Sequence, residues 1–125
     1  MAGAAPAVAA APPMRLRLSG AGRFGSRRRP QVAWTGLDGD VVPLVELATR
    51  LAKVARSLRL EVEERPFRPH LTLGRWRPGR PADGDLMDSL VGYSGPDWPV
   101  VEVRLVESHL GPKPTYGTVA AWPLP

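Results

Sequence analysis

The stretch RPFRPHLTLGRWRP, residues 65–78, sets one of only two histidines in the chain among alternating apolar residues, prolines and arginines. Alternation with a period of two is typical of a β-strand, so residues 70–76 are predicted to form one. On this strand one face is predicted to carry His70, Thr72, Gly74 and Trp76, and the other Leu71 and Leu73. Since the leucines are expected to face the core, His70 and Thr72 are expected to lie side by side on the opposite face.

His70 and Thr72 offer chemistry that suits a phosphate group. An imidazole can take or give a proton near neutral pH, and a threonine hydroxyl can hydrogen-bond a phosphate oxygen. Arg68 shares the parity of His70, whereas Arg75 has the opposite parity and would approach the same group only from the end of the strand. The pattern alone leaves a second interpretation open, a surface histidine on a polar strand face, because an isolated His-x-Thr is common by chance.

The rest of the chain alternates between strand-like and helix-like segments. Strands are predicted over 14–20, 31–37, 70–76, 99–110 and 118–124, with 60–64 as a further extended segment and residues 20–30 as a Gly- and Arg-rich loop. A helix capped by Asp40 is predicted to run to about Leu58, with an apolar stripe at helical spacing, and a short helix around 85–91. Short connections between most strands favour antiparallel pairing, so the predicted fold class is an α+β sandwich.

Composition narrows the possible partners. The chain has 125 residues, a net charge of +5 and no cysteine, and fifteen of its seventeen cationic side chains are arginine. Arginine forks suit phosphate, which favours a polyanionic partner, although a biased genome composition explains the same excess. The lack of cysteine excludes disulfides, thiolate zinc sites and a cysteine nucleophile, and it suits the cytoplasm. No segment is long and apolar enough to span a membrane, and residues 1–13 lack the basic start of an export signal.

Three segments together resemble one known family. PFRPHLTLGR (66–75) resembles the second His-x-Thr-x motif of the two-histidine phosphoesterases, and is closest to the RNA 2′,3′-cyclic phosphodiesterases, also called 2′-5′ RNA ligases. LRLSGAGRFGSRRRPQVAWTGL (16–37) resembles the strand, loop and strand before the family's middle helix. VEVRLVESHLGPKPTYGTVAAWPL (101–124) resembles its C-terminal strand pair. In this order the three segments cover nearly all of residues 14–125.

The resemblance implies a bilobal sandwich of mostly antiparallel strands with flanking helices, and a metal-independent reaction without a cofactor. In the family, two histidines act as general acid and general base on a 2′,3′-cyclic phosphate, which opens to a 2′-phosphomonoester. Carried over to this chain, His70 becomes the proton acceptor. The phosphate-binding candidates are Thr72, Arg68, Arg75 and Arg28. The implied partners are RNA ends with a 2′,3′-cyclic phosphate or small cyclic nucleotides, and the expected form is a cytoplasmic monomer.

One departure from the family pattern stands out, because the sequence contains a single His-x-Thr-x motif. The other histidine, His109, has no Thr or Ser two residues later, and it alternates with Val103 and Leu105 on a face that is expected to point to the core. Residues 1–13 resemble the tail of the family's Ala-rich helix. The chain is therefore expected to hold residues 14–125 as one domain that is incomplete at its N-terminus.

Two questions stay open at this level. A chain with one motif is either an enzyme, a catalytically silent fragment that binds RNA phosphate, or a product that does not fold stably alone. Trp34 and Phe67 are either base-stacking aromatics or core residues.

Overall fold

The computed structural model describes residues 3–26, 28–77 and 84–125. Its elements are α1 (Ala4–Ala9), β1 (Met14–Gly25), β2 (Pro30–Gly39), α2 (Val41–Ser57), β3 (His70–Arg75), α3 (Gly84–Val91), β4 (Trp98–Val100), β5 (Glu102–His109) and β6 (Thr115–Pro123). Among these described residues, no helix is long and apolar enough to cross a membrane.

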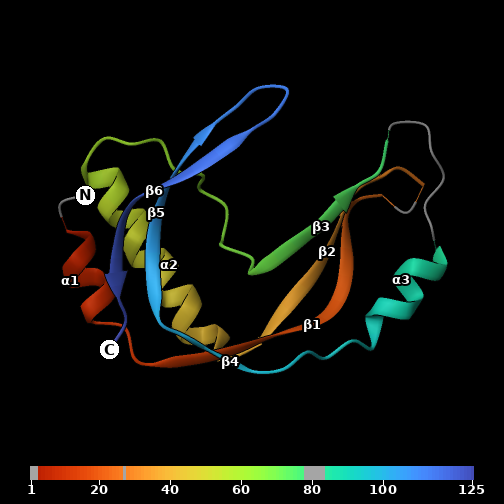
Figure 1. Cartoon of the computed structure of the whole chain (residues 1–125), viewed down its shortest axis with the longest axis horizontal. Helices are drawn as coiled ribbons and strands as arrows, with labels where there is room; N and C mark the ends of the chain where they lie inside the picture. Colours follow the sequence, from red (N-terminus) through yellow and green to blue (C-terminus); the bar gives the residue numbers. More distant parts are fainter. Residues whose placement is uncertain (1–2, 27, 78–83) are drawn as a thin grey trace.

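The strands form two separate antiparallel sheets (Figure 1). The first has the order β3-β2-β1-β4, which places β3 at an edge with β2 as its neighbour, and the second pairs β5 with β6. Helices α1 and α2 lie beside the second sheet, and α3 lies beside β1 of the first. The α+β class and the antiparallel pairing expected from the sequence are therefore confirmed.

Three predicted elements differ from the structure. β1 continues through most of the predicted loop 20–30 and ends at Gly25, because the strand stays paired with β2 past a bulge between Ser19 and Gly22. The predicted strand 99–110 is two strands, which separate at Val101 and join different sheets. Residues 60–64 form no strand.

The core lies between α1, α2, the second sheet and the start of β1. Val8, Ala11, Met14 and Leu47 are buried together, and Leu44 and Leu51 pack against them from α2. This confirms the apolar stripe predicted for the helix. Burying such side chains stabilises the fold by about 1.5–3 kcal/mol each.

Leu71 and Leu73 do not lie in the core, which corrects the prediction. Each is 49% exposed. β3 has one neighbouring strand, and α3 packs mainly against β1, on the far side of β2. The alternation of apolar residues thus predicted the strand and its two faces correctly, but it did not show that the face of Leu71 and Leu73 is left uncovered.

Asp40 joins β2 to α2 in an unexpected way. Its side chain makes no capping hydrogen bond to α2. Instead its Oδ2 accepts a hydrogen bond from the backbone N–H of Arg15 at 2.8 Å, and its own N–H donates to the Arg15 carbonyl at 2.9 Å. The predicted cap is wrong, because the carboxylate ties the end of β2 to the start of β1.

We expect Gly39→Ala to destabilise this junction. Gly39 has φ 97°, and a Cβ there would lie 2.5 Å from the Arg15 carbonyl oxygen. A left-handed backbone and a backbone clash together cost roughly 1–3 kcal/mol of unfolding free energy, which urea denaturation would measure. Gly92→Ala is the matched control, since a Cβ at Gly92 meets nothing within 4 Å. Equal stability of the two variants would contradict the role of the junction.

Candidate functional site

His70 is the first residue of β3 and is exposed. Its Nδ1 lies 2.6 Å from the backbone carbonyl oxygen of Arg68. Because a carbonyl can only accept, Nδ1 carries the proton in this contact. In the neutral ring Nε2 is then an acceptor with a free lone pair, which is the state a general base needs.

Two aromatic rings hold the imidazole from the side of the sheet. The Phe24 ring meets it edge-on, with centroids 5.0 Å apart and planes at 88°, and the Trp34 ring lies 6.3 Å away. Phe24 and Trp34 also contact each other at 5.7 Å. Such ring pairs contribute about 0.5–1.5 kcal/mol beyond their buried area. The imidazole therefore projects from an aromatic surface, although it remains exposed.

Trp34 can occupy this place because residue 22 is glycine. A Cβ at Gly22 would lie 2.2 Å from the indole ring. The indole Nε1 is buried and has no hydrogen-bond partner among the described residues. Packing against Gly22 and Phe24, rather than hydrogen bonding, therefore holds the ring. Of the two sequence interpretations of Trp34, the structure shows a packed residue that also borders His70.

A bulge in β3 changes which residues share the face of His70. His70 pairs with Gly36 and Thr72 with Trp34, but Gly74 pairs with Ala33 and Arg75 with Val32, so β3 has one extra residue after Thr72. Side chains of paired residues point to the same side of a sheet. Arg75 thus joins Thr72 and His70 on one face, whereas Gly74 lies on the other.

This register corrects two expectations. Gly74 does not share the face of His70, Trp76 lies beyond the end of β3, and Arg75 shares the face of His70 by its register alone. The physical reason is that a single extra residue reverses the alternation from that point on. The one sequence signal for the bulge is Gly74 itself, since glycine inside a strand often marks such a place.

Of the other predicted phosphate-binding residues, Arg68 and Thr72 are each two residues from His70 in the sequence, whereas Arg28 lies in the turn after β1. The Arg68 side chain is exposed two residues before His70, and the Thr72 hydroxyl forms no hydrogen bond to any described residue. Arg28 is exposed in the turn after β1, and its neighbour Arg27 lies outside the described residues. Phe67 is 48% exposed, so it is not a core residue.

His109 is not core-facing either. Its side chain is 67% exposed, with Nε2 3.5 Å from a carboxylate oxygen of Glu107. β5 extends beyond the core around Val103, and its last four residues are exposed. Alternation therefore does not separate a core face from a solvent face at this end of the strand.

Within the described ranges, no three His, Asp or Glu side chains gather as metal ligands. A cavity of about 480 Å³ lies away from His70, lined by the start of β1, Asp40, Val101 and Leu124.

Comparison with known proteins gives a consistent family. A model of the 2′-5′ RNA ligase superfamily matches residues 1–112. A Geobacillus stearothermophilus RNA 2′,3′-cyclic phosphodiesterase is 35% identical over 90% of this chain and 35% of its own length. One from Aeropyrum pernix is 30% identical over 77% of this chain and 56% of its own length. The chain thus spans only about a third to about half of these relatives.

A solved structure supports the fold independently. The crystal structure of a Thermus thermophilus protein aligns with 97% of this chain and 66% of its own, with a TM-score of 0.65 and 24% identity.

We expect Gly22→Ala to displace Trp34 and disturb the setting of His70, since overpacking of this kind costs about 1–3 kcal/mol. The chain has only two histidines, so the imidazole proton resonances of His70 can be separated from those of His109 by NMR. Loss of the ring contacts should shift the His70 resonances and leave those of His109 in place. Gly74→Ala is the control, because a Cβ there meets nothing within 4 Å. An unchanged His70 spectrum in Gly22→Ala would show that the aromatic rings do not position the imidazole.

Proposed function

The chain belongs to the 2′-5′ RNA ligase superfamily, and on that premise we propose that it hydrolyses RNA 2′,3′-cyclic phosphodiesters to 2′-phosphomonoesters. The observation that carries the proposal is the hydrogen bond from His70 Nδ1 to the Arg68 carbonyl, which leaves Nε2 free to accept a proton on the face shared with Thr72 and Arg75. The names of the relatives favour an enzyme over a silent RNA-binding fragment.

His70 acts as the general base in this proposal. Its Nε2 takes a proton from the attacking water, whose oxygen forms the new bond to phosphorus while the bond to the 3′ oxygen breaks. A 5′-hydroxyl in place of water gives 2′-5′ ligation by the same displacement. No step of this reaction routes through a metal or cofactor.

The departing 3′ oxygen needs a proton from a second group, because it leaves on the side of phosphorus opposite to the attack. The family resemblance assigns this proton to the histidine of another His-x-Thr-x motif. Residues 1–125 contain one such motif, at His70, so in the reaction proposed for these residues water donates the proton to the departing 3′ oxygen.

Thr72, Arg75 and Arg68 bind the reacting phosphate. Thr72 and Arg75 lie on the face of His70, and their partners Trp34 and Val32 are two residues apart on β2, which corresponds to about 7 Å along a strand. A long arginine side chain can span much of that separation, and its planar fork can bind two phosphate oxygens. Arg68 approaches from the other side of His70. We also propose that the protein acts as a monomer. We propose the cytoplasm as its location, where a chain without cysteine is usual.

We expect His70→Ala to lower the turnover of a 2′,3′-cyclic mononucleotide by about 10²–10⁴-fold, because the general base is lost. Steady-state hydrolysis by the 125-residue chain measures this. His109→Ala is the matched control, since that histidine is exposed on the other sheet, and it should turn over like the wild type. Turnover that survives in His70→Ala, or no hydrolysis by the wild type, would contradict the proposal.

We expect Thr72→Ala to lower kcat/KM by about tenfold to hundredfold, with changes in both kcat and KM, because a hydrogen bond to a charged group contributes about 1.5–3 kcal/mol. Thr72→Ser keeps the hydroxyl and should restore most of the loss. If the serine variant is as poor as the alanine variant, the hydroxyl does not bind the phosphate.

A further inference from the structure

The hydrogen bond of the His70 ring closes over a single residue, Pro69. The imidazole Nδ1 bonds the carbonyl oxygen of Arg68, two residues earlier in the chain, at 2.6 Å. Between these two atoms lie the backbone of Pro69 and the backbone and side-chain torsion angles of His70. The freedom of this short segment therefore decides how firmly the ring is held.

Pro69 restricts that segment on both sides. Its own ring locks φ at about −65°. The residue before a proline is kept out of the helical region, which restricts Arg68 to an extended backbone. His70 is fixed in turn by the ladder, where it pairs with Gly36. Few torsion angles remain free between the carbonyl and the imidazole, so little conformational entropy is lost when the bond forms.

Pro69 also stands where the pairing of β3 with β2 begins. A proline has no N–H to donate to a ladder. The ladder accordingly starts at His70, although β2 continues past Gly36 to Gly39. The carbonyl of Arg68 thus lies before the first paired residue of the strand, where the imidazole can use it as an acceptor.

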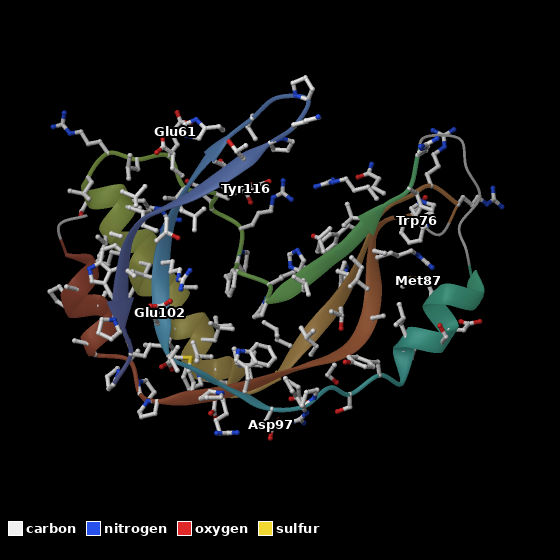
Figure 2. All side chains as sticks on the ribbon, in the orientation of Figure 1. Glu61, Trp76, Met87, Asp97, Glu102 and Tyr116 are labelled. Atoms are coloured by element: carbon white, nitrogen blue, oxygen red, sulfur yellow. The ribbon has the colours of Figure 1, made fainter. Side chains whose placement is uncertain are left out.

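The proline is packed more closely than the residues around it, and the strand is held separately at its other end. Residues 63–68 and His70 are exposed, whereas Pro69 is half-buried. At the far end of β3 the Trp76 N–H donates to the Gln31 carbonyl at 3.1 Å. Figure 2 shows Trp76 beyond the tip of β3. A change at Pro69 should therefore loosen the start of the strand without shifting its register.

The bond to the Arg68 carbonyl decides two properties of the imidazole. It selects the neutral tautomer with the proton on Nδ1, so that Nε2 holds the lone pair. Without the bond, the tautomer with the proton on Nε2 competes, and that form cannot accept a proton from water at Nε2. The bond also becomes charge-assisted once Nε2 is protonated, which stabilises the imidazolium that the reaction forms. An interaction that strengthens during the reaction acts on kcat more than on KM.

We propose that Pro69 is a positioning residue for the reaction at His70, because it holds the Arg68 carbonyl where that carbonyl fixes the tautomer of the imidazole. This rests on the function proposed above for His70. Pro69 itself does not touch the substrate and acts only through the ring. Phe24 and Trp34 contact the imidazole from the sheet, whereas Pro69 determines which of its nitrogens carries the proton.

The test is a graded series at one position, Pro69→Ala and Pro69→Gly, in the full chain. Alanine frees φ, and glycine frees it further. Long-range proton–nitrogen NMR of isotope-labelled protein distinguishes the two tautomers of each histidine at a pH where both rings are neutral. The fraction of His70 with the proton on Nδ1 should fall from wild type to alanine to glycine, while His109 stays unchanged. For a 2′,3′-cyclic mononucleotide, kcat should fall in the same order, by about twofold to fivefold for alanine, with KM nearly constant.

The matched control is Pro66→Ala. Pro66 lies in the same connection between α2 and β3 and is exposed, but the hydrogen bond of His70 does not span it. The control removes the same ring from the chain and should leave both the tautomer and kcat as in the wild type. Equal losses in Pro66→Ala and Pro69→Ala would overturn the proposal, because general loosening of the connection would then explain them.

The two readouts separate this proposal from the function on which it rests. If the tautomer of His70 follows the series but the wild type does not hydrolyse the substrate, the control of the tautomer by Pro69 stands and the function proposed for His70 fails. If hydrolysis depends on His70 but its tautomer is the same in all members of the series, Pro69 is not a positioning residue, whether or not kcat falls.

Discussion

The antiparallel pairing of β3 with β2 is the constraint on which the whole site depends. β3 is an edge strand, so this one ladder sets the position of His70 over Gly36 and of Thr72 beside Trp34. A slip of one residue would turn every side chain of β3 to the other face. The contacts of His70 with Phe24 and Trp34 oppose such a slip, because they exist only in the observed register.

The sequence predicted which segments form helices and strands better than it predicted strand ends and the faces of side chains. Its alternating and helical patterns located β3, α2 and α3 and the antiparallel α+β class. It failed where one residue decides the outcome: the bulge after Thr72 reverses the side of Arg75, and no periodicity shows a single extra residue. Residues 20–25 have the composition of a loop, yet they form a strand because β2 supplies the hydrogen bonds. Pairing overrides local preference in such a case.

The sequence predicted some of the residues at the site and missed others. His70 and Thr72 followed from strand parity, because they precede the bulge. Phe24, Trp34 and Gly22 did not, since their contacts with His70 join strands that are remote in the sequence. The grouping of Arg28 with His70 came from the family resemblance, which carries no distances for this chain. In the structure Arg28 precedes β2, and six residues of that strand separate Pro30 from Gly36, the partner of His70.

The junction at Asp40 has a mechanical consequence. Val101 joins β4 of the first sheet directly to β5 of the second, and Asp40 joins β2 of the first sheet to α2, which packs with the second sheet around the core. Both border the cavity at the start of β1, and the Leu124 N–H donates to the Val101 carbonyl there. Rotation of one sheet against the other is therefore most restricted at this corner, because the connection from α2 to β3, residues 58–69, is much longer. The β1–β2 turn of the first sheet and the β5–β6 turn of the second lie far from this corner (Figure 1). A small rotation there would therefore displace these turns more than the residues near the corner.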